Sequence, residues 1–205
     1  MGYSDTDGEL AVRIARDAVE AHVESRALSP FSVPAHFSEN VGVFVTLNQH
    51  PDGLLRGCIG YPSPFFPLIK ALLKAAEGAC EDPRFPPLRN EEVDLVVVEV
   101  SLLTKPELIE PKRPKDYAKH IVIGEDGIIV AQGPVRGLLL PQVPIEWGWS
   151  AEEFLAEGCM KAGLLADAWL DESTRIYKFQ SDVFAEIQPR GHVTRRNLKA
   201  EHARH

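Results

Sequence analysis

The chain is short of cysteine, of cationic side chains and of long apolar runs, and each shortage argues against a class of protein. Its 205 residues hold three cysteines with no C-x-x-C pair, which disfavours a disulfide framework and a cysteine-based zinc site. No apolar run approaches the roughly 18 residues that a membrane-spanning helix needs. With 22 Lys and Arg against 30 Asp and Glu, the formal net charge is −8, which disfavours nucleic-acid binding through overall charge.

The remaining composition is that of an ordinary globular protein. Apolar residues make up 44% and charged residues 25% of the chain, and a chain of this length buries about 70% of the surface that its unfolded form exposes. The polar, acidic segment 1–7 does not resemble a signal peptide, and unpaired thiols are typical of a reducing compartment. We therefore expect a cytoplasmic protein without a membrane span, a metal or a cofactor.

The first half of the chain predicts helices and strands in alternation. Thr6 and Glu9 have the spacing of a capping box at the start of a helix over Glu9–Ser25. A strand over Val93–Leu103 is apolar on both faces, which is typical of a central strand. The other elements expected here are strands at 41–47 and 54–61 around the turn 50–53, and a helix that opens at Pro67.

The second half repeats this order after a Pro-rich and Lys-rich connector at 105–119. A capping box of Ser150 and Glu153 begins a helix that ends at Gly163. Strands are expected at 120–124, 127–131, 137–140, 175–180 and 183–188. The parallel order predicts an α+β fold within a single domain, 1–205, whose units are 9–104, 120–188 and a basic tail at 189–205.

The segment Leu55–Gly60, with the sequence Leu-Arg-Gly-Cys-Ile-Gly, is the strongest candidate for chemistry. On a strand of period two, Arg56 and Cys58 share one face about 6.6 Å apart, and a guanidinium favours the reactive thiolate. A hairpin symmetric about its turn would place Thr46 opposite Arg56 and Phe44 opposite Cys58. The glycines beside the cysteine would let a ligand or another backbone come close.

Each of these residues also has a purely structural interpretation. A free cysteine on a strand is more often packing than chemistry, and Cys80 and Cys159 fall on apolar helix faces where packing is favoured. A buried Arg56 needs a carboxylate, for which Glu99 on the central strand is the natural candidate, and that pair could be structural alone.

Three further features keep two interpretations each. The loop at 82–87 is either a rigid Pro-rich connection or a binding loop that presents Arg84 to an anion. Gln142 either caps a backbone group or reads a ligand, because its amide both donates and accepts. The basic tail and the basic residues at 112–115 either lie in solvent or contact RNA.

Five segments, in their order along the chain, resemble the AMMECR-one domain family, whose hallmark is the Leu-Arg-Gly-Cys-Ile-Gly sequence. The resemblance covers about 41–187. The matching segments are Leu55–Gly60, Asp82–Phe85, Glu99–Ser101, Leu139–Gln142 and Cys159–Gly163. It implies two subdomains with duplicated strand-helix-strand units around a cleft. It also implies partnership with a radical-SAM enzyme and a Memo-like protein, and it supplies no biochemical function.

Carried over by position, the resemblance points to a candidate site. Its members are Arg56, Gly57, Cys58, Gly60, Arg84, Glu99 and Gln142. In an enzyme, Cys58 would be the nucleophile or acid/base, with Arg56 and Glu99 assisting catalysis and the others binding a small anionic metabolite or a nucleobase. The alternatives are a non-catalytic module that binds a ligand or a partner protein, and an RNA-binding protein. The sequence leaves the oligomeric state open.

Overall fold

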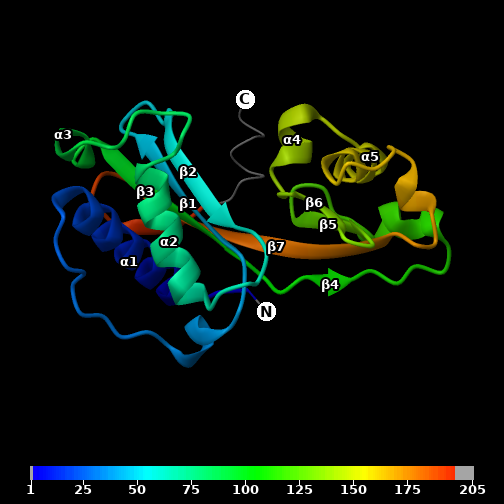
Figure 1. The fold of residues 1–205 in the computed structure, drawn as a ribbon, viewed down its shortest axis with the longest axis horizontal. Coiled ribbons are helices and arrows are strands. Elements are labelled where there is room, and N and C mark those ends of the chain that lie inside the picture. The colour runs from blue at the N-terminus through cyan, green and yellow to red at the C-terminus, as the bar shows by residue number, and fades with distance from the viewer. Residues whose placement is uncertain (1, 197–205) are drawn as a thin grey trace. The chain divides into compact units, whose positions relative to one another are not determined.

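The computed structural model describes residues 2–196 and has the predicted α+β fold, with helices packed on antiparallel strands (Figure 1). The described residues divide into a first unit, 2–103 with 182–196, and a second unit, 104–181. Within residues 2–196, no helix combines the length and the apolar character that crossing a bilayer requires.

The first unit is a sheet with two long helices against one face. Its strands run in the order β2-β1-β3-β7, with β8 paired to β7. The helices are α1 (Asp5–Glu24), α2 (Leu68–Cys80), the short α3 (Asn90–Val93) and the 3-10 helix η1 (Ala35–Ser38). The strands are β1 (Val43–Gln49), β2 (Leu55–Tyr61), β3 (Val96–Leu103), the end of β7 (Arg175–Glu186) and β8 (Val193–Arg195).

Alternation along the strands decides which face the helices cover. Val45 and Leu47 on β1 and Val98 on β3 are fully buried in the core shared with α1 and α2, as the apolar half of a strand of period two should be. The residues between them, such as Thr46 and Glu99, are only half-buried. The prediction that β3 is a central strand is confirmed by its place between β1 and β7.

The start of α1 differs from the sequence prediction. Ser4 is the N-cap, and its hydroxyl accepts from the N–H of Asp7 at 3.1 Å while the Asp7 carboxylate accepts from the N–H of Ser4 at 3.0 Å. The predicted Thr6 and Glu9 box is therefore wrong. Because Asp can close this reciprocal pair as Glu does, the helix begins one turn earlier.

The hairpin of β1 and β2 also pairs differently from the symmetric prediction. Thr46 lies opposite Cys58, not Arg56, and Phe44 lies opposite Gly60, not Cys58. The register shifts at Leu47/Asn48, where Arg56 has no partner on β1. Such a bulge adds one residue to β2 and breaks the strict alternation on which the predicted pairing depends.

The second unit packs α5 (Ala151–Lys161) against β5 (Asp126–Gln132) and β6 (Val135–Leu139). The predicted cap of Ser150 and Glu153 is confirmed, and Gly163 follows the helix with φ of 78°. The first part of β7 pairs with β5 and with β4 (Glu107–Leu108). The remaining elements are α4 (Val143–Trp147) and the 3-10 helices η2 (Pro114–His120) and η3 (Ala168–Leu170).

Two strand predictions in this unit are wrong. The segment 120–124 is not a strand, because Asp126 accepts from the N–H of Val122 at 2.9 Å and returns its own N–H to the Val122 carbonyl, which closes a turn. The two strands expected at 175–180 and 183–188 are one continuous β7. The connector contains β4 and η2.

The described part of the expected basic tail is structured. Residues 193–195 form β8, which pairs with β7. Arg190 forms ion pairs with Glu20 and Asp94, and Arg195 forms them with Asp5 and Asp182. Both arginines are therefore paired with carboxylates of the first unit. Residues 197–205 lie outside the described residues. The predicted duplication, the repeat boundaries and the cleft stay predictions.

Candidate functional site

Three polar side chains form a row across the sheet of the first unit, on the face away from α1 and α2. Thr46 on β1 is paired on one side with Cys58 of β2 and on the other with Glu99 of β3. The Thr46 hydroxyl donates to the Cys58 sulfur at 3.3 Å. Strands lie about 4.8 Å apart, so Cys58 and Glu99 are roughly 10 Å apart. All three are half-buried and lie within a hydrogen-bonded sheet.

An aromatic ring lies beside this row because of Gly60. A Cβ added at Gly60 would come within 2.1 Å of the Phe44 ring, so the ring occupies the place that any other side chain would fill. Phe44 is itself half-buried. The face around Cys58 therefore combines an aromatic surface, a hydroxyl, a thiol and a carboxylate. Gly60, a predicted ligand-binding residue, acts on this face by making room for Phe44.

The loop after α2 closes the outer edge of β2 beside Cys58. Asp82 accepts from the Cys58 N–H at 2.8 Å, and Arg84 donates to the Cys58 carbonyl at 3.3 Å, so together they replace a neighbouring strand. Arg84 also pairs with Asp82 at 2.6 Å, which holds the pKa of that carboxyl well below its usual range. The Asp82 side chain is 1% exposed and that of Arg84 57%, so Arg84 is anchored yet open to solvent.

Arg56 pairs with Glu92 and not with the predicted partner, Glu99. Its guanidinium donates to both carboxylate oxygens of Glu92, at 2.8 and 3.0 Å, and to the Pro87 carbonyl at 3.3 Å. The predicted pairing with Glu99 is wrong, because Arg56 is the bulged residue and its carboxylate comes from α3, next to the Pro-rich loop. These bonds lower the pKa of Glu92 to about 2. Arg56 thus ties β2 to the segment 87–92.

Gly57 has a structural reason of its own. A Cβ at this position would come within 2.2 Å of the Ala79 carbonyl oxygen, so only glycine lets the backbone of α2 lie this close to β2. Of the six hallmark residues, Arg56 and Gly57 hold the loop and helix in place, while Cys58 and Gly60 shape the open face.

The Cys58 thiol is not activated by its surroundings. Burial raises its pKa above the ordinary value, against smaller opposing effects from the Thr46 hydroxyl and the Arg84 guanidinium. The thiol is therefore protonated at neutral pH, which disfavours direct nucleophilic attack. Burial raises the pKa of Cys80 to about 12 and also raises that of Cys159. Both side chains are buried in the hydrophobic core on the apolar faces of their helices, as predicted.

Glu99 pairs with a residue that the sequence assigned to the basic tail. Its carboxylate accepts from a guanidinium nitrogen of Arg196, and the Arg196 N–H donates to the Val183 carbonyl at 2.8 Å. The row thus ends on a carboxylate that already accepts an N–H donor. This contact could not be predicted from composition, because it depends on the pairing of β8 with β7 in the folded chain.

Gln142, the remaining predicted site residue, belongs to the second unit. It is the N-cap residue of α4 without a capping hydrogen bond from its side chain. Within residues 2–196, the Gln142 Oε1 is the one buried side-chain oxygen or nitrogen that lacks a hydrogen-bond partner. Its predicted role in binding stays a prediction.

Thr46, Asp82, Glu92 and Arg196 were not among the predicted site residues. A hairpin register two residues further along β2 would have placed Thr46 opposite Cys58, and an Asp just after a helix end is a frequent backbone acceptor. Among the described residues, no cluster of three or more His, Cys, Asp or Glu is arranged to hold a metal ion. The site is therefore assembled from polar residues on neighbouring strands.

Comparison with known proteins identifies relatives along nearly the whole chain. A family model described as AMMECR1 matches residues 12–184. A protein from Pyrococcus abyssi is 53% identical over 200 residues, which cover 95% of this chain and 97% of that protein. One from Methanocaldococcus jannaschii is 51% identical over 193 residues, covering 94% and 96%. The crystal structure of the uncharacterised protein PH0010 from Pyrococcus horikoshii superposes with a TM-score of 0.81 at 50% identity, covering 95% and 98%.

Proposed function

The chain belongs to the AMMECR1 family, and on that premise we propose that it is a ligand-binding module whose site is the open face around Thr46, Cys58 and Glu99. The ligand is a small planar heterocycle of the nucleobase type, with its ring against Phe44 and its N–H groups directed at the Glu99 carboxylate. The observation that carries this proposal is the row of half-buried polar side chains on three paired strands.

The chemistry of the face supports a neutral, N–H-donating ligand over an anion. Glu99 is a carboxylate that accepts from the Arg196 guanidinium, and an anion placed beside it would be repelled. Phe44 offers an aromatic surface, and base–aromatic stacking favours any planar base. Strands hold such groups more rigidly than loops do, which favours recognition of a fixed shape.

Catalysis through a thiolate receives less support. The proposed activator, Arg56, is bound to Glu92 and Pro87, and burial raises the pKa of Cys58. One observation keeps an enzyme as the second candidate: Cys58 is only half-buried and carries its thiol on the ligand face. In that case a bound substrate would have to supply the group that removes the thiol proton.

Nucleoside binding followed by NMR titration tests the proposal. Guanosine presents two adjacent N–H donors that match a carboxylate, inosine presents one, and adenosine presents a single amino group. We expect affinity to fall in that order for the wild type. Glu99→Gln should reduce guanosine affinity at least about tenfold, because charge-assisted hydrogen bonds are roughly twice as strong as neutral ones.

Two further variants separate a local effect from a general one. Arg196→Met should strengthen guanosine binding, because it removes the internal competitor for Glu99. Glu91→Gln, an equal change at an exposed residue of α3, should leave the affinity unchanged. Absence of binding by all three nucleosides at millimolar concentration would overturn the proposal, as would equal losses in Glu99→Gln and Glu91→Gln.

A further inference from the structure

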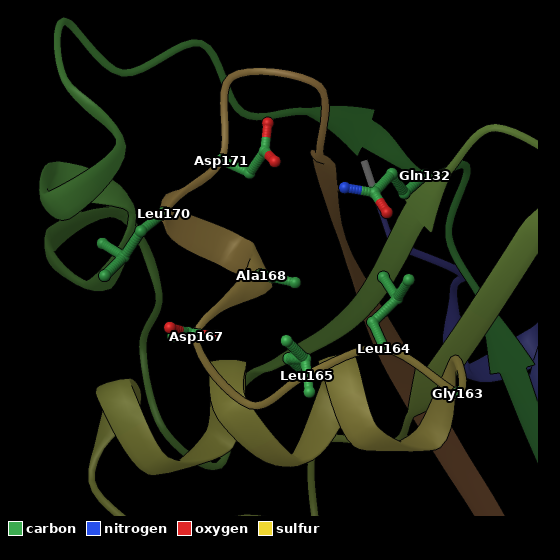
Figure 2. Close-up of a pocket in the computed structure, with 8 residues that line it drawn as sticks. All are labelled: Gln132, Gly163, Leu164, Leu165, Asp167, Ala168, Leu170 and Asp171. Carbon is green, nitrogen blue, oxygen red and sulfur yellow. The ribbon is translucent and has the colours of Figure 1, made fainter.

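A pocket of about 580 Å³ lies within the second unit, between the end of β5 and the segment that follows α5 (Figure 2). Its volume falls within the range of small-molecule sites. None of the residues assigned to the site on the first unit contributes to it. The lining consists of Gln132, Gly163, Leu164, Leu165, Asp167, Ala168, Leu170 and Asp171.

The amide of Gln132 has a fixed orientation in this pocket. The Thr174 hydroxyl donates its one hydrogen to the Ala168 carbonyl at 2.6 Å, so toward Gln132 it can only accept. Gln132 Nε2 donates to it at 3.2 Å and to the Ser173 hydroxyl at 2.9 Å. The acceptor oxygen, Oε1, is thereby left as the free end of the amide, on the side where Figure 2 shows Leu164.

The charged lining of the pocket is entirely acidic. Asp171 accepts from the Ser173 N–H at 2.8 Å, and this bond lowers the pKa of its carboxyl, so it is ionised at neutral pH. Asp167 adds a second carboxylate, and no Lys or Arg is among the eight lining residues. Figure 2 shows the Gln132 amide with its nitrogen on the side of Asp171 and its oxygen turned toward Leu164. A ligand must therefore bring hydrogen-bond donors and positive charge.

The apolar lining sets the rest of the ligand's character. Leu164 and Ala168 form the base of the pocket, and Leu165 is 78% exposed at its rim. Covering aliphatic side chains that are this exposed removes apolar surface from water, which contributes favourably to the free energy of binding. A strongly hydrated inorganic cation would leave that surface uncovered, whereas an organic cation with a short aliphatic chain would cover it.

We infer that this pocket binds a primary alkylammonium group, with the ammonium donating to Gln132 Oε1, the aliphatic chain over Leu164 and Ala168, and the Asp171 carboxylate supplying negative charge to the same pocket. Such a group occurs in free aliphatic diamines and at the end of a lysine side chain. The inference is independent of the proposed nucleoside site, because it rests on residues of the second unit alone.

Titration of 15N-labelled protein with 1,5-diaminopentane tests the inference, with 1-pentanol and pentanoate as matched probes without positive charge. We expect saturable chemical-shift changes at residues 132 and 163–171 with the diamine, and none of that size with the other two probes. Nα-acetyl-lysine amide distinguishes the sources: binding tighter than that of the diamine favours a lysine side chain of a partner, and weaker binding favours a free amine.

The Asp171→Asn variant keeps the hydrogen bond from Ser173 but loses the charge, and it should bind the diamine about threefold to fivefold more weakly, the scale of a solvent-exposed ion pair. Glu152→Gln, on the exposed first turn of α5, is the control and should bind as the wild type does. Shift changes spread over the acidic surface, equal affinity in the two variants, or equal binding of 1-pentanol would each overturn the inference.

Discussion

Replacing Arg56 with Met separates a structural role for the hallmark arginine from a catalytic one. The side chain is 6% exposed and makes three hydrogen bonds, two of them to Glu92. Methionine keeps much of the volume but removes every donor, so Glu92 loses its ion-pair partner. We expect the variant to fold with a reduced free energy of unfolding and to keep the open face around Cys58.

The contacts set the size of the loss. Removing one partner of a fully buried ion pair costs about 3–5 kcal/mol, but the Glu92 side chain is 21% exposed and keeps a 3.0 Å hydrogen bond from the Arg89 N–H. Water and this bond compensate part of the loss. We therefore expect the free energy of unfolding to fall by about 2–3 kcal/mol at pH 7.

Urea unfolding followed by circular dichroism measures this difference, and its pH dependence identifies the partner. The folded-state pKa of Glu92 is lowered to about 2, against an unfolded value of about 4.3. A lowered pKa contributes stability that is fully present above the unfolded value and is lost as the pH falls through the folded value. The gap between wild type and Arg56→Met should therefore be largest near pH 6–7 and shrink between pH 5 and 2.

Arg89→Met is the matched control. Arg89 makes a longer 3.5 Å contact with the same carboxylate, from a side chain that is 75% exposed, so this variant should lie within about 0.5 kcal/mol of the wild type. If Arg56→Met is as stable as Arg89→Met, or if its deficit is unchanged at pH 2, the structural role is refuted.

Two other substitutions test the packing of the first unit by the same unfolding assay. Gly57→Ala places a Cβ against the Ala79 carbonyl and should cost about 1–3 kcal/mol; a loss below about 0.5 kcal/mol would contradict the close approach of α2. Arg16→Met leaves the buried Glu186 carboxylate without its cation and should cost about 3–5 kcal/mol. Adding Glu186→Gln should recover part of that loss, and strictly additive losses would contradict the pairing.

The fold class and most element positions follow from local sequence signals. Apolar residues on both faces of 93–103 mark a central strand, and Ser150 with Glu153 marks a helix start, because each signal acts over a few residues of one element. The same kind of signal failed at 120–124, where the Asp126 carboxylate accepts from the Val122 N–H and an apolar stretch forms a turn in place of a strand. Local propensity yields wherever a specific hydrogen bond competes with it.

The site was harder to predict because it depends on register and on distant segments. The hairpin pairs two residues further along β2 than a symmetric turn predicts, and the bulge supplies one of the two, so Thr46 lies opposite Cys58 while Arg56 has no partner on β1. Glu92 and Arg196 approach their partners only through the folded chain, from 36 and 97 positions away. Cys58 and Glu99 could be chosen as site residues from their residue type and their place on predicted strands. Their shared neighbour Thr46 could be identified only from the strand register.

The alkylation rate of Cys58 by iodoacetamide, measured by mass spectrometry with and without guanosine, tests most directly whether the face around Cys58 is a binding site with an inactive thiol. Alkylation should be slow at pH 7 and rise about tenfold per pH unit toward pH 9, because only the thiolate reacts. Guanosine should slow it saturably, at the concentrations that produce half of the NMR shift change. Rapid alkylation at pH 7 that guanosine leaves unaffected would contradict both the protonated thiol and the position of the ligand.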